Sequence, residues 1–321
     1  MRLRLVTRLS RAARGARAIF RAVTDVDHPV LVHLIVTRRC NLACAYCSEY
    51  DAVSRPVPLA VLARRLNVLA DLRTTMVTLS GGEPLLHPQL EDVVAEVRRR
   101  GMSVTLITNG YLLTPERIRG LNAAGLDHLQ ISIDNVEPDS VSMKSLRLLD
   151  AKLVWLAEMA DFTVAINSVL GAGVHDPEDA VAIARRAREL GLMTSIGIIH
   201  DGRGQLRPLG SRDMRLYEEL KRIGRRRGVL RLNARFQDNL ARGEPNAWRC
   251  RAGARYLYVD EFGRVSYCSQ MRGSPGVPLE SYSRDDIRRE YRSRKPCAPF
   301  CTVNCVQQVG LADNWRSPQT S

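Results

Sequence analysis

From residue 30 to residue 227 the sequence alternates between short apolar runs and longer segments with helical periodicity. The short runs have the composition of strands and lie at 30–37, 76–80, 103–108, 128–134, 162–170 and 194–200. The segments between and after them repeat apolar residues every three to four positions, at 59–73, 88–100, 115–124, 142–160, 177–190 and 211–227. Helices that alternate with short strands are typical of parallel βαβ units. The pattern therefore predicts an α/β fold with six such units, a partial (β/α)6 barrel of the TIM type.

The most distinctive residues of the chain come directly after these predicted strands. Cys40 follows the first strand, the tetrapeptide Gly-Gly-Glu-Pro at 81–84 follows the second, Asn109 follows the third, and Asp134 ends the fourth. The carboxyl ends of parallel strands meet at one edge of the sheet, and α/β barrels carry their active sites there. We therefore expect these residues to share one site.

Three cysteines stand close together in the segment 40–47, which reads Cys-Asn-Leu-Ala-Cys-Ala-Tyr-Cys. Thiolates are the usual ligands of iron–sulfur clusters, and a cubane takes four of them. Cys40, Cys44 and Cys47 would leave one iron without a protein ligand, and an open metal position distinguishes catalytic from structural sites. The alternatives are a structural zinc site with His33 as a fourth ligand, or buried free cysteines.

The motif CxxxCxxC after a first strand, with Gly-Gly-Glu-Pro after a second, resembles the radical S-adenosylmethionine (SAM) superfamily over about residues 30–240. The resemblance implies a [4Fe–4S] cluster on Cys40, Cys44 and Cys47 that binds SAM at its open iron. One-electron cleavage of SAM would yield a 5′-deoxyadenosyl radical, which takes a hydrogen atom from a substrate. It also implies an electron donor such as ferredoxin or flavodoxin.

Several positions match the cofactor-binding motifs of that superfamily. They are Tyr46, Gly81, Gly82, Glu83, Pro84, Asn109, Ser132, Asp134 and Asn167. By resemblance, Tyr46 would lie against the adenine, and the residues at 81–83 would hold the methionyl amino group. Ser132 and Asp134 match the ribose-binding strand. Asn109 in a simple turn and Asn167 as a satisfied core amide remain alternatives.

A second group of cysteines lies near the carboxyl end of the chain. It contains Cys250, Cys268, Cys297, Cys301 and Cys305. Gly263 precedes Cys268 by five positions, and this Gly-x4-Cys element resembles the auxiliary-cluster domains called SPASM and, in shorter form, twitch. The full SPASM pattern has seven cysteines, so five imply one auxiliary [4Fe–4S] cluster rather than two.

Geometry restricts which four of these cysteines could ligate one cluster. On a straight helix Cys297 and Cys305 would lie about 12 Å apart, although Pro296 and Pro299 disfavour a helix there. We favour Cys250, Cys268, Cys301 and Cys305, with Cys297 as an alternate ligand; zinc is the alternative metal. Helical periodicity fades after about residue 240, so this segment is expected to bury little apolar surface and to need a metal staple.

These features predict four parts of the chain: a basic amphipathic helix at 1–29, the barrel at 30–240, an auxiliary-cluster domain at 241–310 and a tail at 311–321. Residues 1–24 carry seven arginines and no acid, half of the net charge of +14. Such a helix can pack on the main domain or bind an anionic membrane surface peripherally. No apolar run is long enough to span a membrane, and clustered cysteines favour a reducing cytoplasm. Aromatic residues make up only 5% of the chain, so nucleic-acid binding is not expected.

The substrate is the least constrained feature. His200 and Asp201 end the sixth predicted strand, and either could take a proton from a substrate radical; a satisfied polar strand end is the alternative. Arg203, Arg207 and Arg212 follow and could bind an anionic substrate, or form a solvated loop. Only 39 residues precede Cys40, too few for the leader-binding domain of many peptide-modifying relatives. We therefore expect a small-molecule substrate such as a sugar, polyol or lipid-linked intermediate, with a peptide or protein substrate as the alternative and a non-catalytic iron–sulfur scaffold as a third.

Overall fold

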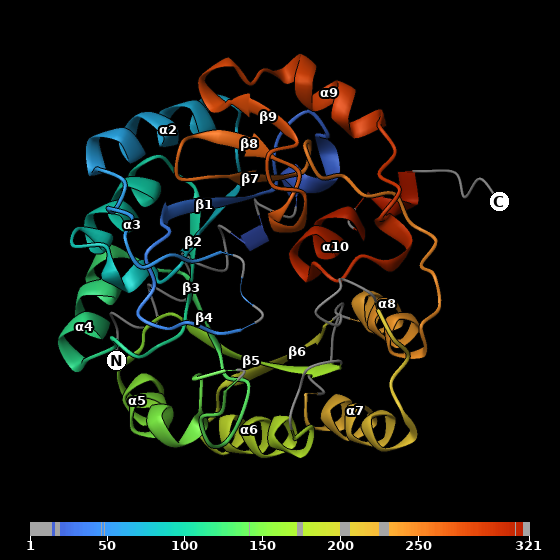
Figure 1. Cartoon of the computed structure of the whole chain (residues 1–321). Helices are drawn as coiled ribbons and strands as arrows, with labels where there is room; N and C mark the ends of the chain where they lie inside the picture. Colours follow the sequence, from blue (N-terminus) through green and yellow to red (C-terminus); the bar gives the residue numbers. More distant parts are fainter. Residues whose placement is uncertain are drawn as a thin grey trace.

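The strands of the described residues form one sheet of nine strands, in the order β6-β5-β4-β3-β2-β1-β7-β8-β9 (Figure 1). The computed structural model describes residues 15–16, 20–45, 47, 49–140, 142–171, 176–199, 206–224, 231–311 and 313–316. The strands are β1 (Leu31–Thr37), β2 (Met76–Gly81), β3 (Ser103–Thr108), β4 (His128–Ser132), β5 (Thr163–Gly171), β6 (Met193–Ile199), β7 (Tyr256–Val259), β8 (Arg264–Ser266) and β9 (Pro275–Pro278).

The first six strands pair in parallel with their sequence neighbours, as the alternating pattern predicted. The sheet does not close, because β6 and β9 stand at its two edges. The predicted α/β fold with a partial barrel is therefore confirmed, as an open barrel whose strand ends lie along one rim.

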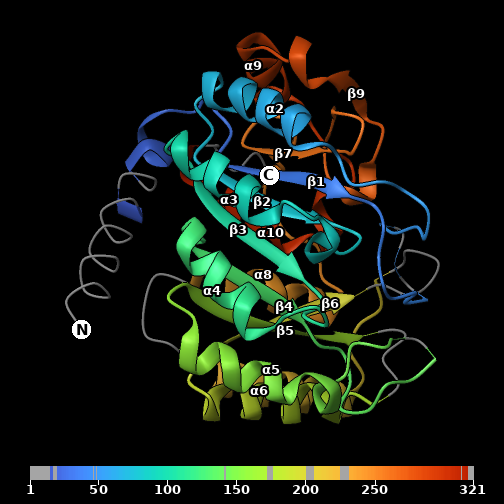
Figure 2. The same cartoon turned by 90° about the vertical axis from the view of Figure 1, so that its left-hand side faces the viewer.

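Helices follow most strands of the parallel part. They are α2 (Leu59–Asp71), α3 (Leu90–Arg99), α4 (Pro115–Ala124), α5 (Leu146–Met159), α6 (Glu178–Glu189), α7 (Ser211–Ile223), α8 (Arg231–Arg242), α9 (Arg284–Arg292) and α10 (Asn304–Leu311). Helices α2 to α6 cover the outer face of the sheet, whereas α10 lies on its inner side (Figures 1 and 2). No helix among the described residues is both long and apolar enough to cross a bilayer.

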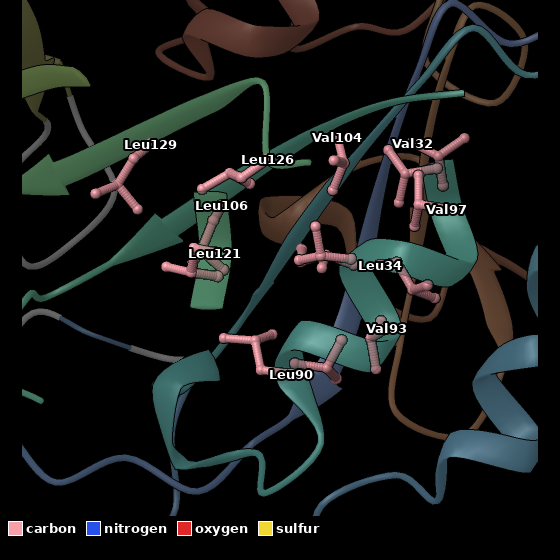
Figure 3. Close-up of a cluster of buried hydrophobic side chains, with 14 of the residues drawn as sticks. Val32, Leu34, Leu90, Val93, Val97, Val104, Leu106, Leu121, Leu126 and Leu129 are labelled. Atoms are coloured by element: carbon pink, nitrogen blue, oxygen red, sulfur yellow. The ribbon is translucent and has the colours of Figure 1, made fainter. Parts of the chain in front are cut away.

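The main core lies between the outer helices and one face of the sheet. Val93 and Val97 of α3 point toward Val32 and Leu34 of β1, with further leucines from β3, β4 and α4 beside them (Figure 3). Each fully buried aliphatic side chain of this kind contributes about 1.5–3 kcal/mol by leaving water. The opposite, inner face of the sheet does not belong to this core.

Residues 254–287 extend this sheet and its core. Strand β7 pairs in parallel with β1, and β8 and β9 continue antiparallel. Leu257, Val259, Val265 and Leu279 are fully buried in the main core. The expectation that this segment buries little apolar surface was therefore wrong, because the open edge of β1 accepts a short buried strand.

Arg255 connects the N-terminal and C-terminal segments of the described chain through a buried ion pair and backbone hydrogen bonds. Arg255 and Asp313 are both fully buried, and Nε of Arg255 donates to Oδ2 of Asp313 over 2.7 Å. The same guanidinium donates to the carbonyls of Ala22, Asp25 and His28. Residues 20–24 are helical, and the rest of the predicted basic helix lies largely outside the described residues.

Candidate functional site

The first three cysteines lie in a loop that begins where β1 ends. The N–H of Cys40 donates to the carbonyl of Asp51 over 3.0 Å, and the N–H of Asp51 donates to the carbonyl of Arg38 over 2.9 Å. These bonds close the loop at its base, so Cys40, Cys44 and Cys47 share one short segment. Cys44 is buried, while Cys40 and Cys47 are half-buried. Tyr46 lies outside the described residues.

Gly81 and Gly82 allow the end of β2 to pass directly under this loop. Two backbone hydrogen bonds join the two segments. The N–H of Gly82 donates to the carbonyl of Thr37, and the N–H of Glu83 donates to the carbonyl of Arg39, both over 2.9 Å. A Cβ atom on Gly81 would stand 1.9 Å from the Thr37 oxygen, and one on Gly82 would stand 2.2 Å from the Arg38 oxygen. The φ of 148° at Gly81 also favours glycine. The close approach therefore requires both glycines.

Glu83 binds two strand ends together from a fully buried position. Its Oε1 accepts from the Thr108 hydroxyl over 2.6 Å and from the Leu85 N–H over 2.9 Å. Its Oε2 accepts from the N–H of Asn109 over 2.7 Å. Burial raises the pKa of this carboxyl, although these hydrogen bonds act in the opposite direction. Most of its acceptor capacity is thus used inside the protein, which leaves less for the methionyl amino group that resemblance assigned to it. Pro84 begins a buried 3-10 turn beside it.

Asn109 reaches from the end of β3 to the cysteine loop. Its Nδ2 donates to Oδ1 of Asn41 over 2.9 Å and lies 3.8 Å from Sγ of Cys40. The side chain is buried at the rim. This placement brings Asn109 next to the first cysteine of the loop.

Asp134 connects the end of β4 with the second cysteine of the loop. Its Oδ2 accepts from the hydroxyl of Ser142 over 2.7 Å, and that hydroxyl lies 3.6 Å from Sγ of Cys44. The Nζ of Lys144 lies 3.5 Å from the same carboxylate oxygen. Ser142 and Lys144 were missed from the sequence, because their segment was predicted to be helix; α5 instead begins at Leu146.

The remaining predicted cofactor contacts lie on the inner face of the sheet. Ser132 stands beside Asn167 in the parallel register, and Asn167 stands beside Ser195. All three are half-buried, and Oδ1 of Asn167 accepts from the Ser195 hydroxyl over 2.9 Å. In-register neighbours share one face of a sheet, so these side chains form a polar row across β4, β5 and β6.

The second group of cysteines gathers on the inner side of β1 and β7. Cys250 and Cys268 are buried among Ile35, Tyr256 and Tyr258, which point inward from those strands. Cys301 is also buried, Cys305 packs against the same cluster, and Cys297 is exposed.

Burial and neighbouring thiols act on the pKa values of these cysteines. Burial raises the pKa of Cys301 to about 12, and Cys250, Cys268 and Cys297 raise it further. Burial raises the pKa of Cys250 to about 11, again with contributions from Cys268 and Cys297. The pKa of Cys305 is raised by burial to about 11 without a contribution from any of them.

Other predicted residues are placed differently or lie outside the described residues. His33 faces inward on β1 and contacts the ring of Tyr256, with ring centroids 5.3 Å apart; burial lowers its pKa to about 4. His200, Asp201 and Arg203 lie outside the described residues. Arg212 forms ion pairs with Asp176 and Glu178. In the described parts of the chain, no three His, Cys, Asp or Glu side chains converge to hold a single metal ion.

The residues at the rim fit an iron–sulfur cluster with a small polar cofactor. Three thiols in one short loop are the donors that such clusters bind. Gly81 and Gly82 bring backbone polar groups next to these thiols. Asn135 adds a buried Oδ1 that has no hydrogen-bond partner at this edge. A polar ligand there would satisfy that acceptor.

The chain belongs to the radical SAM superfamily, whose family model matches residues 34–205, more than half of the sequence. The matched region contains the cysteine loop, Gly81 and Gly82 at the end of β2, and the polar row. The chain is therefore an enzyme of the radical SAM class, and the family implies a [4Fe–4S] cluster and SAM.

Two curated relatives and one solved structure illustrate this similarity. A GTP 3′,8-cyclase from Synechococcus sp. (strain CC9902) is 37% identical over 183 residues, which cover 50% of this chain and 53% of the relative. A PqqA peptide cyclase from Ruegeria pomeroyi is 38% identical over 117 residues, which cover 36% and 31%. The chain thus spans about half or less of these relatives. Streptococcus suis SuiB bound to precursor peptide SuiA has a similar fold, with a TM-score of 0.65 and 14% identity over 84% of this chain and 68% of SuiB.

Proposed function

We propose that this enzyme abstracts a hydrogen atom from a peptide or protein substrate. The observation that carries the proposal is the similarity of the site-bearing region to PqqA peptide cyclases, which recur among the curated relatives at 32–40% identity. The fold it shares with SuiB, a protein that binds a precursor peptide, supports the same choice. A small-molecule substrate, which the sequence alone favoured, becomes the second candidate because a GTP cyclase is also similar.

The open sheet supports a large substrate. The edge strands β6 and β9 are not joined, and the polar row of Ser132, Asn167 and Ser195 is half-buried on the inner face. An extended chain offers backbone donors and acceptors that hydroxyl and amide side chains can bind. The row therefore suits a peptide backbone as well as the cofactor.

We assign Cys40, Cys44 and Cys47 to the cluster that binds SAM. When bound, cluster and cofactor supply the reducing electron and the carbon radical that removes hydrogen. Gly81 and Gly82 let backbone groups approach, Asn109 and Asp134 orient the loop and the cofactor from two strand ends, and Glu83 positions the rim. Ser132 and Asn167 contact the cofactor from the inner face. We retain Tyr46 and Pro84 as cofactor contacts by resemblance alone.

The second group is assigned to one auxiliary [4Fe–4S] cluster in a SPASM- or twitch-like arrangement. Cys250, Cys268, Cys297 and Cys301 are its ligands in this proposal, because Cys250, Cys268 and Cys301 are buried and Cys297 lies at the other end of the short 3-10 turn that ends at Cys301. Cys305 is then a half-buried cysteine next to the cluster. Free thiols in both groups suit a reducing cytoplasm, with ferredoxin or flavodoxin as electron donor.

His200 and Asp201 directly follow β6 and are retained as general-base candidates. Removal of a proton from a substrate radical would complete an oxidation.

The substrate is tested with deuterium. The reconstituted enzyme is incubated anaerobically with SAM, a reductant and either a perdeuterated precursor peptide encoded beside its gene or deuterated GTP. We expect deuterium in 5′-deoxyadenosine only with the peptide. Transfer from GTP, or from another small molecule in place of the peptide, would overturn the peptide assignment and leave the enzyme class intact.

A further inference from the structure

Two acidic and two basic side chains connect the first cysteine loop with the segment that carries Cys268. Arg38 stands two residues before Cys40, and Glu49 stands two residues after Cys47. Both side chains reach toward the hairpin that follows β7. Strand β7 lies beside β1 and runs parallel to it (Figures 1 and 2), so the turn after β7 meets the loop after β1.

Glu49 is the contact on the side of the first loop. Its Oε2 accepts a short hydrogen bond from the hydroxyl of Tyr258 and lies 3.6 Å from Nη1 of Arg272. Its backbone stands two residues from Cys47. Glu49 therefore links the end of the first cysteine loop to Tyr258 of β7 and to Arg272.

Arg272 is the contact on the side of the second group. Its Nη2 lies 2.6 and 2.5 Å from the two carboxylate oxygens of Glu261, and Nη1 lies 3.5 Å from the Tyr258 hydroxyl. Nη1 of Arg38 lies 3.9 Å from Glu261 as well. The side chains of Arg272, Glu49 and Glu261 are 23%, 21% and 11% exposed, so solvent screens these charges less than on an open surface.

The backbone of Arg272 is tied to that of Cys268. The N–H of Met271 donates to the Cys268 carbonyl over 3.1 Å, and the N–H of Ser274 donates to the Met271 carbonyl over 3.1 Å. The N–H of Gly273 donates to the hydroxyl of Ser266 over 3.0 Å. Cys268 and Arg272 therefore belong to one short turn that is held by backbone hydrogen bonds.

We propose that Glu49, Tyr258 and Arg272 couple the two cysteine groups, so that a filled second site holds the first cysteine loop in its cluster-binding conformation. Ligation of Cys268 fixes the turn, the turn fixes Arg272, and Arg272 with Tyr258 fixes Glu49 and the loop end at Cys47. Arg272 is thus a positioning residue for a cluster that it does not ligate. The inference rests on the proposed placement of the two clusters and is independent of the peptide substrate.

The test measures how firmly the first site keeps its iron. The anaerobically reconstituted full chain is treated with an iron chelator, and samples taken over time are reduced with dithionite. The electron paramagnetic resonance signal that changes when SAM is added, which is that of the reduced SAM-binding cluster, is then measured. We expect Arg272→Gln to lose this signal about tenfold faster than the unaltered chain, in the range of coupling through packed networks. Cys250→Ala, which cannot complete the second site, should lose it at a similarly increased rate.

Four further variants make the result specific. Arg272→Lys keeps the positive charge and should recover part of the lost retention. Arg264→Gln serves as the control, because this arginine of the same hairpin donates to the carbonyl of Gly276 and not to the loop. Glu49→Gln should accelerate loss as Arg272→Gln does, and the double variant should not exceed the larger single effect.

Retention at the unaltered rate in both Arg272→Gln and Cys250→Ala would overturn the coupling. Additive effects of Glu49→Gln and Arg272→Gln would overturn it too, since independent sites add. Loss of the signal from every variant including Arg264→Gln would point to general destabilisation and likewise refute the proposal. None of these outcomes depends on turnover, so they are distinguishable from failure of the proposed function.

Discussion

Glu83 belongs to a cofactor-binding motif, but its side chain accepts hydrogen bonds from the protein itself. The carboxylate is buried and accepts three hydrogen bonds from two neighbouring segments. The sequence identified the residue through its motif, but it could not show that its partners would be Thr108 and the backbone of Asn109. Such partners depend on the register of β2 and β3, which no short motif contains.

Glu83→Gln should therefore weaken both the fold of the rim and the affinity for SAM. In the variant, an amide NH2 group would replace Oε2 and face the N–H of Asn109, so two donors would meet. Leaving these buried donors without an acceptor costs about 1–3 kcal/mol of stability. The free energy of unfolding in urea and equilibrium dialysis of SAM measure the two effects. Glu91→Gln, at a half-buried surface carboxylate, is the control. Unchanged values for Glu83→Gln would contradict this role.

His28 makes the stability of the fold depend on pH. Nη1 of Arg255 donates to its Nδ1 over 3.3 Å, so Nε2 carries the hydrogen and donates to Thr75 over 3.2 Å. Burial, with the charge of Arg255, lowers the pKa of His28 to about 4, despite the nearby carboxylate of Asp25. The unfolded chain, with a histidine pKa of about 6.5, binds the proton first as pH falls.

Stability should therefore fall between about pH 6.5 and pH 4. From pH 7 to pH 5 the unaltered chain should lose about 2 kcal/mol more than His28→Gln, measured as the free energy of unfolding in urea. Equal losses in the two proteins would rule out His28 as the source.

At the scale of elements, the parallel units were predictable and the additions to them were not. Strands β1 to β6 follow from alternation of strand-like and helical periods, which is a local property of the chain. Strand β7 has only four residues, and its place beside β1 depends on an open sheet edge that exists only in the folded state. Helix α8 was missed, and α5 starts four residues late, because Ser142 is engaged with Asp134.

The ligands of the second site are also a question of element packing. Cys297 and Cys301 flank a short 3-10 turn, whereas Cys305 lies inside α10. Cys297→Ala should reduce iron from about eight to about four atoms per chain, while Cys305→Ala should leave about eight. Iron and sulfide analysis of the anaerobic proteins measures this. The reverse result would restore Cys305 as the ligand.

At the scale of the whole molecule, Arg255 and Asp313 hold together segments that are more than two hundred residues apart. One buried guanidinium contacts the N-terminal segment at residues 22–28 and the C-terminal segment at Asp313. The sequence pattern predicts residues 1–29 and 311–321 as separate peripheral parts. Nothing local in the sequence could predict their meeting at a residue of the intervening segment.

Asp313→Asn should destabilise the fold by about 3–5 kcal/mol, because it leaves a buried arginine without its counter-charge. Glu116→Gln removes a carboxylate that is 75% exposed and should change stability by no more than about 0.5 kcal/mol. Denaturant unfolding measures both. If both variants changed the free energy of unfolding by a similarly small amount, the buried pair would not hold the two segments together.

The central claim is that Cys40, Cys44 and Cys47 hold the cluster that cleaves SAM. It is tested most directly by measuring 5′-deoxyadenosine from SAM and a reductant in the anaerobically reconstituted unaltered chain and in Cys40→Ala. The account predicts product from the unaltered chain and a loss of at least about a thousandfold in the variant, since an incomplete thiolate set cannot retain the cluster. Cleavage by Cys40→Ala at the unaltered rate would contradict the account.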